Sequence, residues 1–369
     1  MSKVNFRTTL SIDEVKDLII ATGDEVTNVI ISEPGVGKSS ILKMMEEELG
    51  TEEYDFIYVD CPVKDMMDIA ASIPNHDTRR LEYYVSSLFK LGNGKAKVIM
   101  LDEFMKAPKL LQIIFTRLML ERTVGDEPLP ESESGKKSIV FGTSNNVSDG
   151  VGDAMLDHAG NRVCKIEMRK PSAEEHNVWG SKIDPATGKP RVARSLRAWS
   201  AMNPRAFASY LDGDQDDNPF IFNPSKGRGK QFVSPRSLTK ASVFVYRRDK
   251  LTENALTAAL AGTLGESAAK SIAAFLALES KLISYADVIK APTSIPIPTD
   301  ISAQVMMMLE AIDCVKTQDE LSKYMEFVER LPSAEVQSIF FTMMLRTKAK
   351  IARYNEKINN WARDNHYLM

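Results

Sequence analysis

The stretch "IISEPGVGKSSILK", residues 30–43, runs from an apolar segment through a turn with two glycines into a segment with helical spacing. Glycines between a strand and a helix let backbone N–H groups surround an anion, and the N-terminus of the helix adds partial positive charge. The pattern G-x-x-x-x-G-K-[ST] binds nucleotide phosphates in this way, with its lysine on the β- and γ-phosphates and its hydroxyl on Mg²⁺. The stretch therefore predicts a loop that binds ATP through Glu33, Pro34, Gly35, Val36, Gly37, Lys38, Ser39 and Ser40.

One position departs from the pattern, because Ser32 stands where the first glycine is expected. Serine lacks the freedom of glycine at positive φ, so the change bears on the entry to the loop and leaves Gly35, Gly37, Lys38 and Ser39, the residues that contact phosphate. The structural alternative is a tight strand-to-helix turn with a surface lysine. A predicted strand at 26–32 and a predicted helix at 38–49 flank the loop as phosphate binding requires, and they favour a phosphate-binding loop over a simple turn.

A second motif, KVIMLDEF at residues 97–104, ends an apolar segment with two carboxylates. Ligands of open α/β sheets bind beyond the carboxyl ends of the strands, so Asp102 is expected beside the phosphate loop, holding Mg²⁺ mostly through water. Glu103 is expected to polarise the water that attacks the γ-phosphate. Two solvated carboxylates at a strand end are the alternative. The Asp-Glu pair, with an extra strand at 55–60 between the two motifs, indicates the additional-strand division of P-loop ATPases.

The distribution of strand and helix signals predicts the domain organisation. Segments 26–32, 55–60, 97–101, 138–143 and 163–168 read as strands, which alternate with helical segments and lack hairpin turns. This predicts a five-stranded parallel sheet covered on both faces, in an α/β domain over residues 1–170. Strand signals vanish beyond Pro171. We expect a helical domain over 171–290 and, after a proline-rich linker, a helical region over 300–369 that is either a docking module or a stabilising cap.

The composition limits the class of protein. The chain has 369 residues, 43% of them hydrophobic, and a formal net charge of -3, so it has no global basic field for nucleic acid. Three widely spaced cysteines form no C-x-x-C pair, which argues against a disulfide framework and a zinc site. No apolar run is long enough to span a bilayer. We expect a cytoplasmic protein with no membrane partner, in which the methionines, including Met306, Met307 and Met308, fill the core.

Four separated motifs, SEPGVGKS, VIMLDEF, VFGTSNN and VSPRSL, resemble those of the MoxR-like group of AAA+ ATPases, including versions encoded by large bacteriophages. The resemblance covers most of residues 10–285. It implies a P-loop AAA+ core of five parallel strands followed by an all-α lid and a C-terminal helical region. It also implies ATP and Mg²⁺ as cofactors, with Ser39 and Asp102 as the metal ligands, and the host cytoplasm as the location if the protein is encoded by a phage.

The resemblance implies two further catalytic residues besides Glu103. The sensor 1 residue of the family falls on Asn145, with Thr143 and Asn146 as near alternatives, and its amide would position the attacking water. The arginine finger falls on Arg162, which would reach the ATP of a neighbouring subunit. MoxR proteins usually have L-D-R-F at this place, whereas four residues separate Asp157 from Arg162 here.

Two other segments acquire roles from the same resemblance. The motif FVSPRSLTKAS matches sensor 2, with Ser234 as a natural N-cap and Pro235 at the first helical position. This places Arg236 in the first turn of a lid helix, where the family binds nucleotide. The polar segment 125–138 fits the position of a family insert that faces a central pore or a partner, although the residues alone indicate only a loop.

Three classes of function follow. The leading hypothesis is an ATP-hydrolysing remodelling machine of the chaperone type, a homo-oligomeric ring of six subunits acting on a protein client. The resemblance implies a partner with a von Willebrand factor A domain. The second class is a motor or loader associated with nucleic acid, supported by the basic stretches 191–197 and 226–230. The third is a nucleotide-gated scaffold that turns ATP over poorly, against which the intact Glu103 argues.

Overall fold

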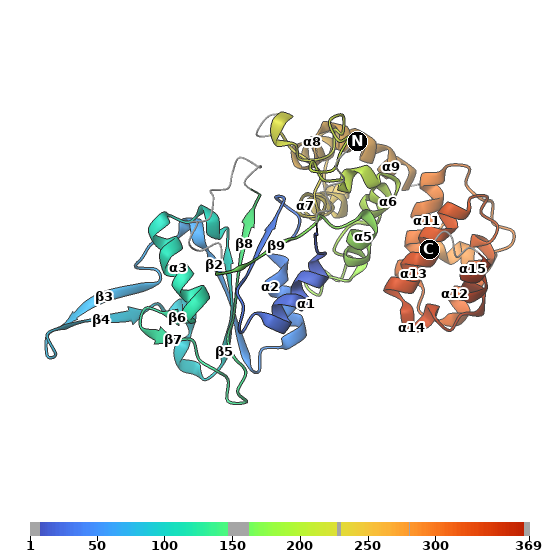
Figure 1. Cartoon of the computed structure of the whole chain (residues 1–369). Helices are drawn as coiled ribbons and strands as arrows, with labels where there is room; N and C mark the ends of the chain where they lie inside the picture. The colour runs from blue at the N-terminus through green and yellow to red at the C-terminus, as the bar shows by residue number, and fades with distance from the viewer. Residues whose placement is uncertain (1–7, 147–161, 227–229, 280, 365–369) are drawn as a thin grey trace, which may run out of the picture. The chain divides into compact units, whose positions relative to one another are not determined.

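The computed structural model describes residues 8–146, 162–226, 230–279 and 281–364. It divides into two compact units, residues 1–170 and 171–369, which we call the first and second units (Figure 1). Among the described residues, no helix is both long and apolar enough to cross a membrane.

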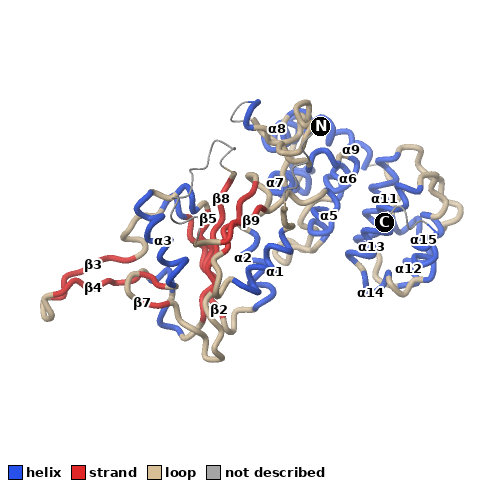
Figure 2. Tube along the Cα trace, in the orientation of Figure 1, coloured by secondary structure: helices blue, strands red, loops and turns tan. Residues whose placement is uncertain are grey.

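The first unit is built on a parallel sheet of five strands in the order β2-β5-β8-β1-β9 (Figure 2). Apolar residues of α1 and α2 pack on one face of the sheet, and those of α3 pack on the other. The prediction of a parallel sheet covered on both faces is therefore confirmed. The elements are β1 (Asn28–Ser32), β2 (Tyr54–Asp60), β5 (Ala96–Asp102), β8 (Ile139–Asn145) and β9 (Cys164–Glu167), with α1 (Ile12–Thr22), α2 (Ser40–Leu49) and α3 (Lys109–Glu121).

The strand order identifies the division of the P-loop fold. β8 lies between β1, which leads into the phosphate loop, and β5, which carries the Asp-Glu pair. One additional strand thus separates the two motifs in the sheet, which is the arrangement of the P-loop AAA+ fold. The strand that lies between the motifs in the sequence, β2, is at the edge of the sheet beyond β5.

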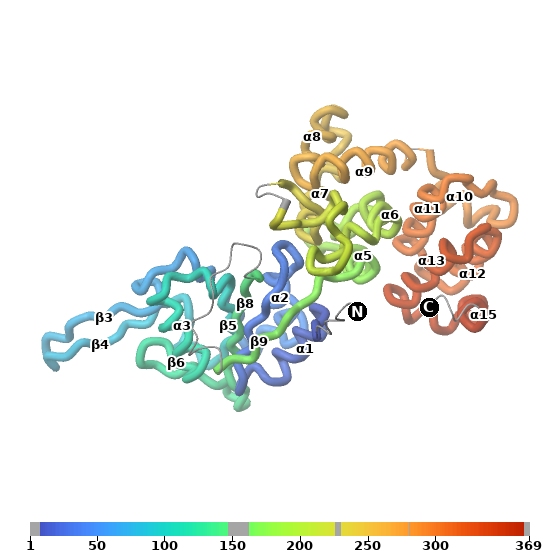
Figure 3. The backbone as a smooth tube through the Cα atoms, turned by 45° about the horizontal axis from the view of Figure 1, so that its top comes forward, coloured from blue at the N-terminus to red at the C-terminus, as the bar shows by residue number. Residues whose placement is uncertain are grey.

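Two antiparallel hairpins lie outside the main sheet, so the expectation that the first unit lacks hairpins was wrong. They are formed by β3 (Ala70–Asn75) with β4 (Arg80–Val85) and by β6 (Thr123–Val124) with β7 (Glu127–Pro128). The turn of the first hairpin contains no glycine or proline. Instead, the Asn75 side chain accepts hydrogen bonds from the backbone N–H groups of Asp77 and Thr78, at 3.0 and 3.1 Å. Figure 3 shows this hairpin extending away from the sheet of the first unit.

The second unit is helical, with no strand among its described residues. A single hydrophobic core extends from Ala173 to Trp361, so the predicted lid region and the C-terminal region share it. Met306, Met307 and Met308 are fully buried in this core, as expected. The helices are α5 (Ala173–Ser181), α6 (Arg194–Met202), α7 (Pro235–Tyr246), α8 (Glu253–Leu264), α9 (Glu266–Glu279), α10 (Tyr285–Lys290), α11 (Ile301–Cys314), α12 (Gln318–Val328), α13 (Ala334–Thr347), α14 (Ala349–Ala352) and α15 (Glu356–Asp364).

The basic stretch 191–197 forms internal contacts of the second unit rather than a free cationic surface. Arg197, at the centre of α6, is fully buried and forms an ion pair with Asp313 of α11. Arg194 pairs with Glu310 at 2.9 Å and with Glu279 at 3.3 Å. These pairs hold α6 against α9 and α11, so the use of this stretch as evidence for nucleic acid was wrong. Residues 227–229 of the other basic stretch lie outside the described residues.

Candidate nucleotide-binding site

The phosphate loop joins β1 to α2, and its two glycines take left-handed backbone conformations. Gly35 has a φ of 78° and Gly37 a φ of 110°, which residues with a Cβ rarely adopt. Ser32 is the last residue of β1 and is not among the residues with positive φ. Serine in place of the first glycine therefore puts no strain on the entry to the loop.

Lys38 folds over the loop and is buried, with only 6% of its surface exposed. Its ammonium group donates hydrogen bonds to Asn145 Oδ1 at 2.7 Å and to the carbonyl oxygen of Glu33 at 3.1 Å. Both the carbonyl and the hydroxyl oxygen of Ser32 accept further bonds, at 3.3 and 3.2 Å. These four acceptors are neutral oxygen atoms of the phosphate loop and of β8.

Asp102 ends β5 beside the start of α2, and three hydroxyl groups surround its carboxylate. The Thr143 hydroxyl donates to Oδ1, and the Tyr58 hydroxyl donates to Oδ2 at 2.7 Å. The Ser39 hydroxyl lies 3.4 Å from Oδ2. Ser39 precedes α2 but makes no side-chain cap hydrogen bond with it, so its hydroxyl faces Asp102 rather than the helix.

The Ser39 hydroxyl and the Asp102 carboxylate fit a site for Mg²⁺. Both are hard oxygen ligands, and Mg²⁺ in nucleotide sites is held by one or two such groups together with water and phosphate oxygens. Within the described parts of the chain, no group of three or more His, Cys, Asp and Glu side chains could form a metal cage of protein ligands alone.

Glu103 occupies a strained backbone position next to Asp102. Its φ of 55° and ψ of 33° are left-handed, which costs free energy for a residue other than glycine. Its side chain accepts a 2.8 Å hydrogen bond from the Asn145 amide nitrogen and forms an ion pair with Lys106. Strain of this kind persists where surrounding contacts fix the residue, and here they hold the carboxylate beside Asn145.

The structure brings Lys38, Glu103 and Asn145 together at the carboxyl edge of the sheet. Asn145 ends β8, which lies between β1 and β5, the strands that precede Lys38 and Glu103, and its amide contacts both side chains. The near alternatives for sensor 1 are arranged differently. Thr143 contacts Asp102, and Asn146 lies beyond the end of β8. The catalytic roles stay predictions, and the geometry favours Asn145 over its neighbours.

Arg162 is not brought to the phosphate loop of its own chain. It immediately precedes Val163 and β9, which runs parallel to β1 with Cys164 beside Asn28 at the start of β1. The phosphate loop follows the other end of β1, after Ser32. Arg162 is exposed and lies at the amino ends of the strands, whereas the phosphate loop lies at their carboxyl ends.

Arg236 belongs to the second unit, at the second residue of α7. As predicted, Ser234 is the N-cap of this helix, with its hydroxyl accepting a hydrogen bond from the Ser237 backbone N–H at 3.1 Å, and Pro235 occupies the first position. The Arg236 side chain is exposed. Its contact with nucleotide stays a prediction.

The predicted insert 125–138 also lies away from the phosphate loop. Glu127 and Pro128 form β7, and hydrogen bonds tie Ser132 and Ser138 to residues near the amino ends of β2 and β5. The Ser132 hydroxyl donates to Glu53, which precedes β2, at 2.6 Å, and the Ser138 hydroxyl accepts from the Lys97 backbone N–H, near the start of β5, at 2.8 Å. The expectation that this segment faces a pore or a partner stays untested.

Sequence reasoning missed Tyr58, Lys106 and the hydroxyl of Ser32 as members of the site. Alternation in the segment DFIYVD places Tyr58 on one face of β2, but nothing in the sequence gives the register of β2 against β5. Lys106 is three residues from Glu103, a spacing at which charged side chains meet on a helical turn, so this pair could have been found.

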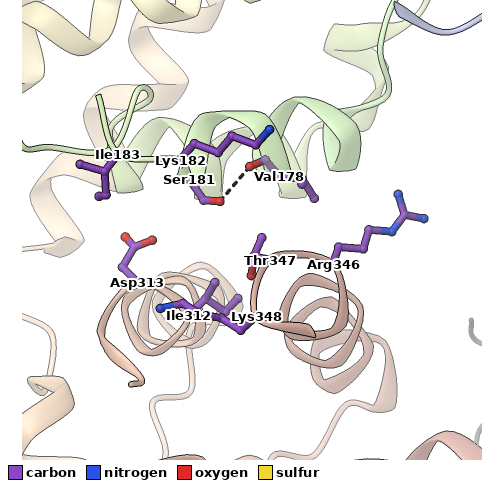
Figure 4. A pocket seen from close by; sticks show the side chains of 9 residues that line it. All are labelled: Val178, Ser181, Lys182, Ile183, Ile312, Asp313, Arg346, Thr347 and Lys348. Carbon is purple, nitrogen blue, oxygen red and sulfur yellow. Dashed lines mark hydrogen bonds between the residues drawn. The ribbon is translucent and has the colours of Figure 1, made fainter. Parts of the chain in front are cut away.

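A cavity of about 260 Å³ lies in the second unit, between the end of α5 and the ends of α11 and α13 (Figure 4). The cavity is lined by Val178, Ser181, Lys182, Ile183, Ile312, Asp313, Arg346, Thr347 and Lys348. Several of its polar groups bond within the protein. The Ser181 hydroxyl donates to the Val178 carbonyl at 2.8 Å, and the Lys348 ammonium donates to the Val315 carbonyl at 2.9 Å. The cavity contains none of the predicted nucleotide-binding residues.

No protein-family model matches the chain, and no curated protein matches it. Solved structures with a similar arrangement include NtrX from Brucella abortus in complex with ADP, at 13% identity over 96% of this chain and 68% of that chain, with a TM-score of 0.37. A mutant of RuvB from Thermotoga maritima has 13% identity over 86% of both chains and a TM-score of 0.35. ORC2 from Aeropyrum pernix has 11% identity over 99% of this chain and 98% of that chain, with a TM-score of 0.35. At such scores the fold assignment rests on the strand order of this chain itself.

Proposed function

We propose that this chain is a Mg²⁺-dependent ATPase. The observation that carries the proposal is the position of Asn145, whose side chain bonds to Lys38 of the phosphate loop on one side and to Glu103 on the other. A phosphate-binding cation, a polarising carboxylate and a hydrogen-bonding amide thus meet at one edge of the sheet, as hydrolysis of a γ-phosphate by water requires.

Each residue of the proposed site has a separate task. The amides of the glycine-rich loop and the Lys38 ammonium bind the phosphates, and Ser39 and Asp102 hold Mg²⁺, which neutralises developing charge on the phosphate oxygens when it is bound. Glu103 polarises the attacking water, and Asn145 orients that water and the Glu103 carboxylate. Because this carboxylate is present and held in place, the geometry favours hydrolysis over a scaffold that only binds ATP.

The proposed ATPase acts as a homo-oligomeric ring, with six subunits as in the MoxR-like group that its motifs resemble. Arg162 supports this proposal. It lies at the amino ends of the strands, so it cannot contact nucleotide bound to its own chain at the phosphate loop, which lies at their carboxyl ends. An arginine finger at this position must serve a neighbouring subunit, where a guanidinium stabilises charge in the transition state.

A protein client is favoured over nucleic acid by the β3–β4 hairpin. Ile73 and Tyr84 project from one face of this hairpin and Leu81 and Tyr83 from the other, and each is at least 45% exposed. Exposed apolar clusters of this kind mark surfaces that contact other proteins. The basic stretch 191–197, which favoured nucleic acid, is used in internal ion pairs. We therefore propose chaperone-type remodelling of a protein client. By its resemblance to the MoxR-like group, the proposed partner of this chain is a protein with a von Willebrand factor A domain.

The ATPase proposal is tested with two single variants. Lys38→Ala should lose binding of Mg·ATP, because the affinity for phosphate depends on this charge. Glu103→Gln should bind ATP and leave it unhydrolysed, because an amide cannot polarise the attacking water. Wild-type turnover by Glu103→Gln would move the catalytic role to another residue, and wild-type binding of Mg·ATP by Lys38→Ala would refute the phosphate loop.

The client proposal is tested by the response of turnover to added macromolecules. A double variant, Leu81→Ser with Tyr84→Ser, should keep basal ATPase activity and lose stimulation by unfolded protein. Stimulation of the wild type by single-stranded DNA or RNA, falling steeply with salt, would instead favour the nucleic-acid motor. The motor also predicts that Lys230→Gln weakens that response.

A further inference from the structure

The Tyr58 hydroxyl is placed against the carboxylate that would hold Mg²⁺. β2 and β5 are parallel neighbours in which Tyr58 pairs with Met100 and Asp60 pairs with Asp102. Paired residues share a face of the sheet, so Tyr58 and Asp102 are diagonal neighbours on one face, within reach of a long side chain. The phenol donates a 2.7 Å hydrogen bond to Asp102 Oδ2. This bond joins two adjacent strands at the carboxyl edge of the sheet.

We propose that Tyr58 is a positioning residue for Asp102 and thereby strengthens the binding of Mg²⁺ with the nucleotide. This inference rests on the proposed ATPase function. Tyr58 contacts neither the loop nor Lys38 through any hydrogen bond found in the structure's described residues. Its effect should therefore reach the metal through Asp102.

The three hydroxyl groups around Asp102 contact both of its carboxylate oxygens. Thr143 donates to Oδ1, whereas Tyr58 donates to Oδ2, the oxygen nearest to Ser39. A carboxylate held at both oxygens cannot rotate freely about its Cβ–Cγ bond. The remaining lone pair of Oδ2 then stays directed toward the Ser39 hydroxyl, the other proposed ligand, before the metal arrives. A site preorganised in this way loses less conformational entropy on binding.

About 45% of the Tyr58 surface is exposed, so Tyr58→Phe is not a substitution in the hydrophobic core. The change removes the hydroxyl that donates to Asp102 and leaves the aromatic ring in place.

The test is the Mg²⁺ dependence of nucleotide binding rather than of turnover. A fluorescent, non-hydrolysable ATP analogue is titrated with the 369-residue chain carrying Tyr58→Phe at increasing Mg²⁺, and also in EDTA. We expect the Mg²⁺ concentration at half-maximal binding to rise about three- to tenfold, which is the effect of losing one ordinary hydrogen bond. Binding in EDTA should stay within about twofold of the wild type, because the loop and Lys38 are intact. Mn²⁺ binding to the nucleotide complex, followed by electron paramagnetic resonance, should weaken in parallel.

Tyr54→Phe is the matched control. Tyr54 lies on the same strand and the same face as Tyr58, at the start of β2 and far from Asp102 in register. This variant should leave the Mg²⁺ midpoint unchanged, and thermal unfolding of all three proteins checks that each is folded.

The outcomes separate this inference from the function on which it rests. An unchanged Mg²⁺ midpoint in folded Tyr58→Phe, in a protein whose wild type binds Mg·ATP, would overturn the role of Tyr58 alone. Equal loss of binding with Mg²⁺ and in EDTA would also overturn it, because Tyr58 would then support the whole site. A wild type that binds no nucleotide under either condition would overturn the proposed function and this inference with it.

Discussion

The side-chain amide of Asn145 donates a 2.8 Å hydrogen bond to Glu103. The same amide accepts a bond from Lys38, so it links the carboxylate expected to polarise water to the cation expected to bind phosphate. A hydrogen bond that orients a catalytic carboxylate contributes to the transition state more than to the binding of substrate.

Asn145→Ala should therefore lower kcat while leaving nucleotide affinity within a few fold. Loss of one oriented donor in an active site typically costs about 10²-fold or more in rate. Steady-state ATPase assays and equilibrium binding of a fluorescent analogue measure the two effects. Asn146→Ala is the matched control and should retain turnover, and the reverse pattern would move the sensor role to Asn146.

Ser32→Gly restores the usual first glycine of the motif and should change little. Ser32 lies in β1 without a positive φ, so glycine relieves no strain there, and the carbonyl oxygens of Ser32 and Glu33 still accept from Lys38. We expect ATP affinity within about twofold of the wild type and a loss of about 0.5–1 kcal/mol in stability, as for glycine within a strand. Binding improved more than tenfold would show that serine compromises the loop.

The sequence predicted the sheet better than the hairpins, for a physical reason. The central strands β1, β5 and β8 are buried on both faces, so they read as apolar runs such as VIML before Asp102. The β3–β4 hairpin buries neither face, and its turn is closed by the Asn75 side chain rather than by glycine or proline. The sequence of the hairpin therefore shows neither a buried apolar run nor a glycine or proline in the turn.

The same contrast applies to the candidate site. The phosphate loop, Asp102 and Glu103 follow from local spacing, since each lies at a fixed distance from a strand end. Tyr58 depends on the register between β2 and β5, and one residue of slip would turn it to the other face. Arg197 illustrates a different error, in which a charged side chain was expected at the surface and is buried. Its neighbours in sequence suggested a charged surface, but the pairing with Asp313 comes from packing between α6 and α11, 116 residues apart.

Asp313→Ala should destabilise the second unit strongly, because it leaves the fully buried Arg197 guanidinium without its ion-pair partner. Breaking a buried pair in this way costs about 3–5 kcal/mol. Urea unfolding followed by tryptophan fluorescence isolates the effect, since Trp179, Trp199 and Trp361 are all in the second unit and are the only three tryptophans.

The matched control for this change is Glu174→Ala, which removes the partner of Arg346 in an ion pair that is partly exposed on both sides. It should cost at most about 1 kcal/mol. If Asp313→Ala cost no more than this control, the buried pair would not be what holds α6 in place, and the surface role of the basic stretch would have to be reconsidered.

Arg162 provides the test of a shared site between subunits. It is exposed at the amino edge of the sheet, so Arg162→Ala should keep ATP binding in its own chain and lose hydrolysis, because the guanidinium acts on the nucleotide of a neighbour. Lys165→Ala, which removes an exposed cation of β9 three residues away, should retain activity. Both variants are compared at protein concentrations that span the assembly range, where wild-type specific activity should rise with concentration.

Mixing inactive variants then identifies the subunit that supplies the arginine. Rings that combine Arg162→Ala with Glu103→Gln subunits contain interfaces at which an intact Glu103 meets an intact Arg162 of the other chain. Activity should reappear at those interfaces, although neither variant has any alone. An arginine that acts within its own chain would give no recovery, because each subunit in the mixture still lacks one of the two groups. A mixture of Lys38→Ala with Glu103→Gln subunits is the control. Lys38 and Glu103 belong to the same site, so this mixture should stay inactive. Recovery only in the mixture of Arg162→Ala with Glu103→Gln would show that the rescue needs groups from opposite sides of one interface.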